Sequence, residues 1–234
     1  MLLRHGTRPP RRDSGGAVKL YNYFRSGTSH RLRIALNLKG VVTDYVAVNL
    51  LAEENLQDEF ATINPQRLVP ALDTGSQMLI QTPAIIEWLE EMYPDPPLLP
   101  ADVGERAFVR ALAAVIGNDV HPLNNRRVLQ YLRHHFAADG TAIDAWCAQW
   151  IEPGLDTYAA LLTQRTRSGT YSCGSQPTIA DIYLVPQLVS ARRFKVDLAR
   201  WPALLDIEAA CLELEAFRFA APDAQSDAPR PVSK

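Results

Sequence analysis

The chain has 234 residues, 47% of them hydrophobic, so it can bury one large core or two smaller ones and is not a wholly disordered protein. Its 24 Lys and Arg residues balance 26 Asp and Glu residues, and the net charge of -2 gives no electrostatic reason to expect nucleic acid or an anionic membrane as partner. The chain has no apolar run long enough for a transmembrane helix and no apolar signal-peptide core, which predicts a soluble, cytoplasmic protein with a small-molecule partner.

The predicted fold begins near residue 18. Residues 1–17 combine Arg, Pro and Gly without apolar periodicity, which is typical of a flexible N-terminal extension. After them, the pattern predicts a strand at 19–24, a helix at 29–40 and a second strand at 41–50. Such a βαβ unit should have parallel strands and a right-handed crossover.

A polar helix is predicted at 53–64, followed by two short strands at 69–74 and 77–80. The next helix, at 82–93, opens on Thr-Pro, which suits a helix start because Thr is a capping residue and the missing N–H of Pro would be unpaired there anyway. The first half of the chain is therefore predicted to be α/β.

The stretch 94–104, "PDPPLLPADVG", contains four prolines and is predicted to be an interdomain linker. After it the periodicity is helical, which predicts an all-α second half. The predicted helices span 104–120, 126–136, 142–164, 178–194 and 203–217. The predicted organisation is an extension at 1–17, an α/β domain at 18–97, an all-helical domain at 103–222 and a flexible tail at 223–234.

The turn after the first strand carries the first candidate site. In "FRSGTSHRLRIAL" the opening N–H groups of the helix have no intrahelical partner and favour an anion, and Thr28 lies where its hydroxyl could join them. These donors suit a thiolate, because stabilising the charged form lowers the pKa of a thiol. The competing interpretation is that Ser26 and Thr28 only cap the helix.

The cysteines do not themselves indicate thiol chemistry. Cys147, Cys173 and Cys211 are odd in number, widely spaced and without a C-x-x-C pair, so neither a disulfide framework nor a metal site is predicted. Any thiol chemistry would use a sulfur from another molecule.

Two further motifs of the first half could bind a ligand. In "NPQRLVPALD", Pro70 precedes a short strand and leaves Val69 with free backbone groups that could pair with an extended, peptide-like ligand, and a cis Val69–Pro70 bond would give the sharp entry. In "QTPAII", Gln81 and Thr82 stand at a helix N-terminus, which suits a carboxylate.

The helical half contributes a basic cluster in "HPLNNRRVL", with His121, Asn124, Asn125, Arg126 and Arg127. Adjacent arginines on a helix point about 100° apart, so one of the two is expected to face a cleft and the other water. A solvated basic face is the alternative.

A second arginine pair, Arg192 and Arg193 in "SARRFKVDL", follows an apolar helix, where cations at the C-terminal end could serve only the helix dipole. In "QPTIAD", Thr178 and Asp181 form the capping-box pattern with Asp in place of Glu and are predicted to be structural.

In this order and spacing, the motifs resemble the glutathione transferase superfamily, and "SGTSHRLRIALNLKG", "NPQRLVPAL", "QTPAIIEWLEE" and "PTIADIYLVPQ" resemble its zeta class, over residues 19–221. The resemblance implies a thioredoxin-like N-terminal domain, an all-α C-terminal domain, a homodimer and glutathione bound between the domains of each subunit. Within the class, "HPLNNRR" and "SARRFKVDL" are most similar to the glutathione-dependent isomerases that act on maleylpyruvate in gentisate degradation.

The resemblance also implies roles for individual residues. Thr28, with Ser26 and the helix N-terminus, would hold the glutathione sulfur. The rest of the cofactor would contact Gln66, Val69, Pro70, Gln81, Thr82 and His121. The carboxylates of a small dicarboxylate substrate would be bound by Arg25, Arg127 and Arg193, with Asn125 nearby.

One departure from the class concerns the first motif. Zeta-class proteins usually carry Ser-Ser-Cys where this chain has Ser26, Gly27 and Thr28, so an activity that depends on a cysteine is not expected. The isomerases of maleylpyruvate share this substitution, which favours them over those of maleylacetoacetate. The alternatives are maleylacetoacetate isomerisation, a conjugating or dehalogenating transferase, and a non-catalytic interaction domain.

Overall fold

The computed structural model describes residues 18–165 and 169–229. The predicted N-terminal extension at 1–17 and the last five residues of the predicted tail lie outside the described residues. Within the described ranges, no helix combines the length and the apolar character needed to cross a lipid bilayer.

A mixed four-stranded sheet, in the order β2-β1-β3-β4, forms the first half. Strand β1 (Lys19–Asn22) pairs in parallel with β2 (Asp44–Ala47), which confirms the predicted βαβ unit. Strands β3 (Ala71–Asp73) and β4 (Met78–Ile80) continue the sheet in antiparallel fashion.

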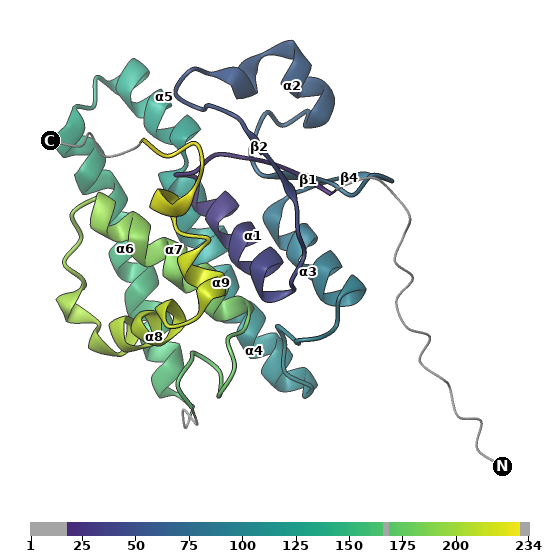
Figure 1. The fold of residues 1–234 in the computed structure, drawn as a ribbon. Helices are drawn as coiled ribbons and strands as arrows, with labels where there is room; N and C mark the ends of the chain where they lie inside the picture. The colour runs from purple at the N-terminus through teal and green to yellow at the C-terminus, as the bar shows by residue number, and fades with distance from the viewer. Residues whose placement is uncertain (1–17, 166–168, 230–234) are drawn as a thin grey trace, which may run out of the picture.

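Helices cover both faces of this sheet (Figure 1). Helices α1 (Gly27–Leu38) and α3 (Thr82–Met92) pack against each other on one face, and α2 (Asp58–Ile63) lies on the other. The helix predicted at 53–64 is in fact a 3-10 turn (Glu54–Leu56) followed by α2, because Gln57 between them is extended, with φ -70° and ψ 152°.

The second half is helical, as predicted. Its helices are α4 (Val103–Ala114), α5 (Arg126–Phe136), α6 (Gly140–Thr163), α7 (Ile179–Arg193), α8 (Pro202–Leu212) and α9 (Glu215–Arg218). A π-helical turn (Val115–Val120) and a 3-10 turn (His121–Asn124) connect α4 to α5. The helix predicted at 203–217 is interrupted because Leu214 adopts an extended conformation, with φ -85° and ψ 130°.

Helix α7 joins the two halves. Eleven of its fifteen residues are buried, and it packs against both α1 and α4. Leu32 and Ile34 of α1 belong to the same apolar core as Leu184 and Leu188 of α7. This shared core places the N-terminal end of α1 beside residues of the helical half, and the site described below lies there.

The proline-rich stretch at 94–104 is held by a buried ion pair. The Nζ of Lys39 lies 2.6 Å from Oε2 of Glu90 and donates a second bond to the carbonyl of Pro96, and the Lys39 side chain is 0% exposed. Glu90 also accepts the backbone N–H groups of Leu98 and Leu99, at 2.9 and 3.2 Å.

The C-terminal segment differs from its prediction as a flexible tail. Pro222–Ala224 form a 3-10 turn, and the side chain of Gln225 donates to the carbonyls of Phe219 and Ala221. The carboxylate of Asp227 accepts the backbone N–H of Phe24, which follows β1. Residues 223–229 are thus bound by local hydrogen bonds of Gln225 and by the distant partners of Asp227, Phe24 and Tyr45.

Candidate active site

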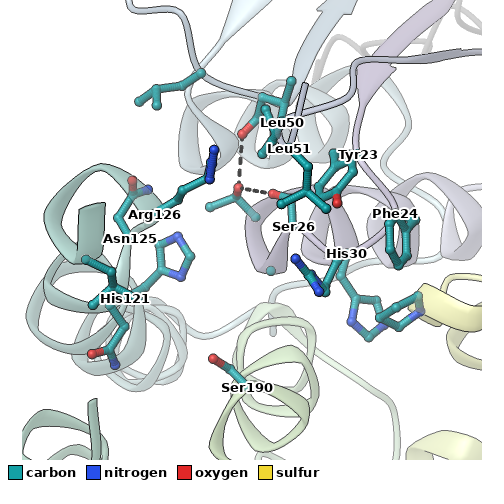
Figure 2. A pocket seen from close by; sticks show the side chains of 18 of the residues that line it. Tyr23, Phe24, Ser26, His30, Leu50, Leu51, His121, Asn125, Arg126 and Ser190 are labelled. Atoms are coloured by element: carbon teal, nitrogen blue, oxygen red, sulfur yellow. Dashed lines mark hydrogen bonds between the residues drawn. The ribbon is translucent and has the colours of Figure 1, made fainter. Parts of the chain in front are cut away.

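A cavity of about 790 Å³ opens between the two halves of the molecule. The turn that leads into α1, the segment before β3, the start of α5 and the C-terminal part of α7 all line it (Figure 2). Residues 50–56 and the C-terminal segment also contribute, so the cavity gathers side chains from segments that are far apart in the sequence.

The turn before α1 presents two linked hydroxyl groups. Ser26 is the N-cap of α1, and its Oγ accepts the N–H of Ser29 at 3.2 Å and lies 2.9 Å from Oγ1 of Thr28. The Thr28 hydroxyl also lies 3.1 Å from the carbonyl oxygen of Val69, to which it can donate. Ser26 is therefore a cap, whereas Thr28 bridges the helix start to the segment before β3.

That segment contains the cis Val69–Pro70 bond that the sequence allowed. Val69 and Gln66 line the cavity, and Oε1 of Gln66 accepts from Nε2 of Gln81 at 2.5 Å. Gln81 and the buried Thr82 stand at the start of α3. Neither of them lines the cavity, and Pro70 does not line it either. Gln81 thus reaches the cavity only through Gln66.

Several arginines give the cavity a strong positive charge. The predicted Arg25, Arg127 and Arg193 line it together with Asn125. Burial and the nearby Arg25 lower the pKa of Arg193. Cations placed this closely in a partly enclosed space repel one another, so a dianion that neutralises them would be bound favourably.

The two arginine pairs behave differently. Nη1 of Arg192 lies 2.6 Å from Oε1 of the buried Glu208 on α8, while Arg193 lines the cavity, so these neighbouring positions on α7 point apart. Arg126 and Arg127, in contrast, both line the cavity, although only one was expected there. Nη2 of Arg126 lies 3.7 Å from Oε1 of Glu53, and Glu53 also lines the cavity.

Comparisons with known proteins show the family to which the chain belongs. Residues 20–97 match the family model "Glutathione S-transferase, N-terminal domain". The chain is 63% identical to the maleylpyruvate isomerase of Ralstonia sp., over 90% of this chain and 99% of the relative. The chain belongs to the zeta class of the glutathione transferases, the class of a relative from Euphorbia esula that is 38% identical over 92% of this chain. The maleylacetoacetate isomerase of Pseudomonas aeruginosa is 42% identical over 91% of this chain and 99% of that relative.

Solved structures of this class have the same fold. A holo structure of a zeta-class maleylpyruvate isomerase, 63% identical, superimposes with a TM-score of 0.89 over 90% of this chain and 100% of the other. A maleylacetoacetate isomerase from Anaeromyxobacter dehalogenans, with dicarboxyethyl glutathione and citrate bound in its active site, is 40% identical and has a TM-score of 0.81 over 92% and 98% of the two chains.

The zeta-class fold also brings residues to the cavity that sequence reasoning missed. Arg31 is 2% exposed, its guanidinium lies 4.4 Å from the ring centroid of Tyr183, and its Nε has no hydrogen-bond partner among the described residues. Arg133 lies seven residues after Arg126, on the same face of α5, and this spacing was a usable signal. No local pattern marks Arg31, because its position depends on the packing of α1 against α7.

Two neutral imidazoles accompany Arg31. Burial, with help from Arg33 and Arg31, lowers the pKa of His30 to about 3, and burial and Arg31 lower that of His121 to about 3. The side chain of His121 lies against Gly27, since a Cβ added to this glycine would stand 3.6 Å from Cε1 of His121. Near neutral pH both rings are uncharged, so each can accept a hydrogen bond at one nitrogen.

The buried His30 is expected to make the fold sensitive to acid. Its pKa of about 3 lies below its unfolded value of 6.5, so the unfolded chain binds more protons between these values and the free energy of unfolding falls as pH falls through 6.5. From pH 7 to pH 5 the loss due to this one residue should be about 2 kcal/mol. Urea unfolding of the His30→Gln variant should show a correspondingly flatter pH profile.

The exposed His134 on α5 provides the control, since replacing it removes a surface histidine and leaves the buried site unchanged. If His30→Gln and His134→Gln have the same pH profile as the unsubstituted chain, His30 is not the source of acid sensitivity.

Proposed function

We propose that this chain uses glutathione to isomerise maleylpyruvate, a short unsaturated dicarboxylate, to its trans isomer. The observation that carries the proposal is one cavity lined both by the start of α1, with Ser26 and Thr28, and by the arginines Arg25, Arg127 and Arg193. The 63% identity to the maleylpyruvate isomerase of Ralstonia sp. supports the choice of substrate. The family resemblance further implies a homodimer in the cytoplasm, and we propose both, the dimer being testable by the sedimentation mass.

The donors at the cavity fit a tripeptide thiol. Buried polar atoms of His30, Arg31 and Asn124 line the cavity region without a hydrogen-bond partner among the described residues, as expected where a ligand supplies the partner. Thr28 and the first N–H groups of α1 would hold the sulfur, and Gln66 and Val69 would bind along the peptide.

When bound, glutathione supplies a thiolate that adds reversibly to the alkene, so that rotation about the former double bond becomes possible. The chain has three tasks around this chemistry. Thr28, Ser26 and the helix N-terminus keep the sulfur anionic by favouring its charged form. The arginines bind the two carboxylates bidentately and keep their own charge. Donors near the ketone oxygen stabilise the negative charge that develops there, as in an oxyanion hole.

Turnover of maleylpyruvate with a catalytic amount of glutathione tests the proposal. Isomerisation should convert many equivalents of the acid, followed by ultraviolet absorbance, without loss of thiol. Consumption of one thiol per turnover would indicate a conjugating transferase instead, and neither conversion nor consumption would indicate a binding protein. Full activity in the absence of glutathione would refute the proposed use of the cofactor.

Replacing Thr28 by Val should raise the pKa of glutathione bound to the protein. The variant keeps the shape of the side chain and loses the hydroxyl, so the sulfur has one donor fewer, and we expect a rise of about one pKa unit. The ultraviolet absorbance of the bound thiolate as a function of pH measures this shift.

Thr62 offers a matched control. Its exposed hydroxyl also donates to a backbone carbonyl, that of Glu59 at 2.6 Å, but lies outside the cavity lining. Thr62→Val should leave the pKa of the bound thiol unchanged. An unchanged pKa in Thr28→Val as well would assign thiolate stabilisation to Ser26 and the backbone N–H groups.

A further inference from the structure

The C-terminal segment returns to the start of the chain after α9. Two groups from the first half bind the carboxylate of Asp227: the backbone N–H of Phe24 at 3.0 Å and the hydroxyl of Tyr45 at 2.5 Å. Phe24 immediately precedes Arg25 and Ser26, so Asp227 binds the backbone of the turn that presents both of these residues to the cavity.

The buried guanidinium of Arg33 adds hydrogen bonds to this connection. Nη2 of Arg33 donates to the carbonyl of Phe24 at 3.0 Å, and its Nε donates to the carbonyl of Ala220 at 2.9 Å, just before the segment begins. Burial lowers the pKa of Arg33 to about 10, and the nearby Tyr45 and Asp227 oppose this shift. Asp227 therefore ties the Phe24 turn to the C-terminal segment, and Arg33 ties it to Ala220, just before that segment.

The segment reaches the cavity itself. Pro222 and Asp223 line it before Asp227, and Ala228 and Pro229 line it after. Figure 2 shows Phe24 next to the yellow ribbon of this part of the chain, away from the labelled residues of α5. The segment thus forms one side of the pocket.

We propose that residues 222–229 form the wall that limits the length of the substrate, and that Asp227 is the positioning residue that holds this wall and the Phe24 turn in place. The inference rests on the proposed function and adds to it the element that selects among diacids. Prolines on both sides of Asp227 restrict the backbone, so the carboxylate needs to fix only a stiff segment.

Few other contacts hold this wall, which makes the role of Asp227 testable. The segment contributes no residue to the buried apolar core, which ends at Ala220. Local opening of such a segment requires little free energy compared with global unfolding. Removing the carboxylate should therefore release the wall while the rest of the fold remains intact.

The test compares Asp227→Ala with Asp227→Asn, which keeps the size and an acceptor oxygen, and with Ser226→Ala, an exposed neighbour in the same segment. The substrates are maleylpyruvate and maleylacetoacetate, which is one methylene longer. In Asp227→Ala the ratio of kcat/KM for the shorter acid to that for the longer acid should fall about tenfold, since one methylene in a fitted pocket is worth about that factor or more. Asp227→Asn should restore most of the ratio, and Ser226→Ala should not change it.

Two measurements do not depend on turnover. Hydrogen exchange of residues 222–229 should accelerate in Asp227→Ala alone, and calorimetric binding of dicarboxyethyl glutathione should weaken while that of glutathione stays near its original value. If the substrate ratio, exchange and binding in Asp227→Ala all equal those of Ser226→Ala, the wall is refuted. If the unsubstituted chain isomerises neither acid, the proposed function fails, and the exchange and binding data still decide whether Asp227 holds the segment.

Discussion

Replacing Arg193 with alanine is expected to lower kcat/KM for maleylpyruvate about a thousandfold while the dissociation constant of glutathione stays within about twofold. Arg193 is the last residue of α7 and lines the cavity. Its planar fork can bind a carboxylate through two parallel hydrogen bonds, which alanine removes entirely. Steady-state kinetics and titration calorimetry with glutathione measure the two effects separately.

The neighbouring Arg192 provides the matched control. It binds the buried carboxylate of Glu208 and faces α8, away from the cavity. Arg192→Ala should keep nearly the original kcat/KM and lower the thermal midpoint, because it leaves a buried carboxylate without its partner. Arg193→Lys keeps the charge but loses the planar fork, so its kcat/KM should lie between that of Arg193→Ala and that of the unsubstituted chain. If Arg193→Ala weakened glutathione binding as much as turnover, Arg193 would belong to the cofactor site.

Replacing Asp181 with alanine is expected to lower the free energy of unfolding by about 4 kcal/mol, the largest stability effect that we predict. The Asp181 side chain is fully buried and accepts the N–H groups of Ser172 and Thr178 at 2.8 and 2.7 Å, and the Thr178 hydroxyl at 3.0 Å. Alanine would leave all these buried donors without an acceptor. Urea unfolding measures the loss, and the isomerase activity of the remaining folded protein should be little changed.

An exposed cap gives the comparison. Asp139 accepts the N–H of Ala142 at 2.8 Å at the start of α6, and water can replace it there, so Asp139→Ala should cost about 1 kcal/mol. Equal losses for Asp139→Ala and Asp181→Ala would show that burial does not set the strength of these caps. A loss of activity in Asp181→Ala beyond the loss of folded protein would show that the start of α7 is coupled to the cavity at its other end.

Several elements could be predicted because their signals are local. The capping residues Ser26 and Thr178 and the Pro at the start of α3 mark helix ends through groups at most four positions away. The helix predicted at 53–64 was wrong in its middle because the extended backbone of Gln57 interrupts it, and composition does not reveal a single backbone angle.

The candidate site was predictable to the extent that its residues lie in such local motifs. Thr28, Asn125 and Arg127 belong to helix starts whose sequences are typical of ligand-binding turns, and they line the cavity. His30 and Arg31 were missed because nothing in their sequence neighbourhood separates a buried polar residue of α1 from an exposed one. Their burial depends on α7, which lies far away in the sequence.

The sequence alone determined the order of the elements, the α/β and all-helical halves and the capped turn that we propose as the thiolate site, because hydrophobic period and helix capping act between residues close together in the chain. The tertiary structure decided which arginine of a pair enters the cavity and that a carboxylate 203 positions away binds the Phe24 turn. The physical reason is that the direction of a side chain and its burial follow from packing between distant segments, and the sum of many weak contacts in the common core of α1 and α7 sets that packing.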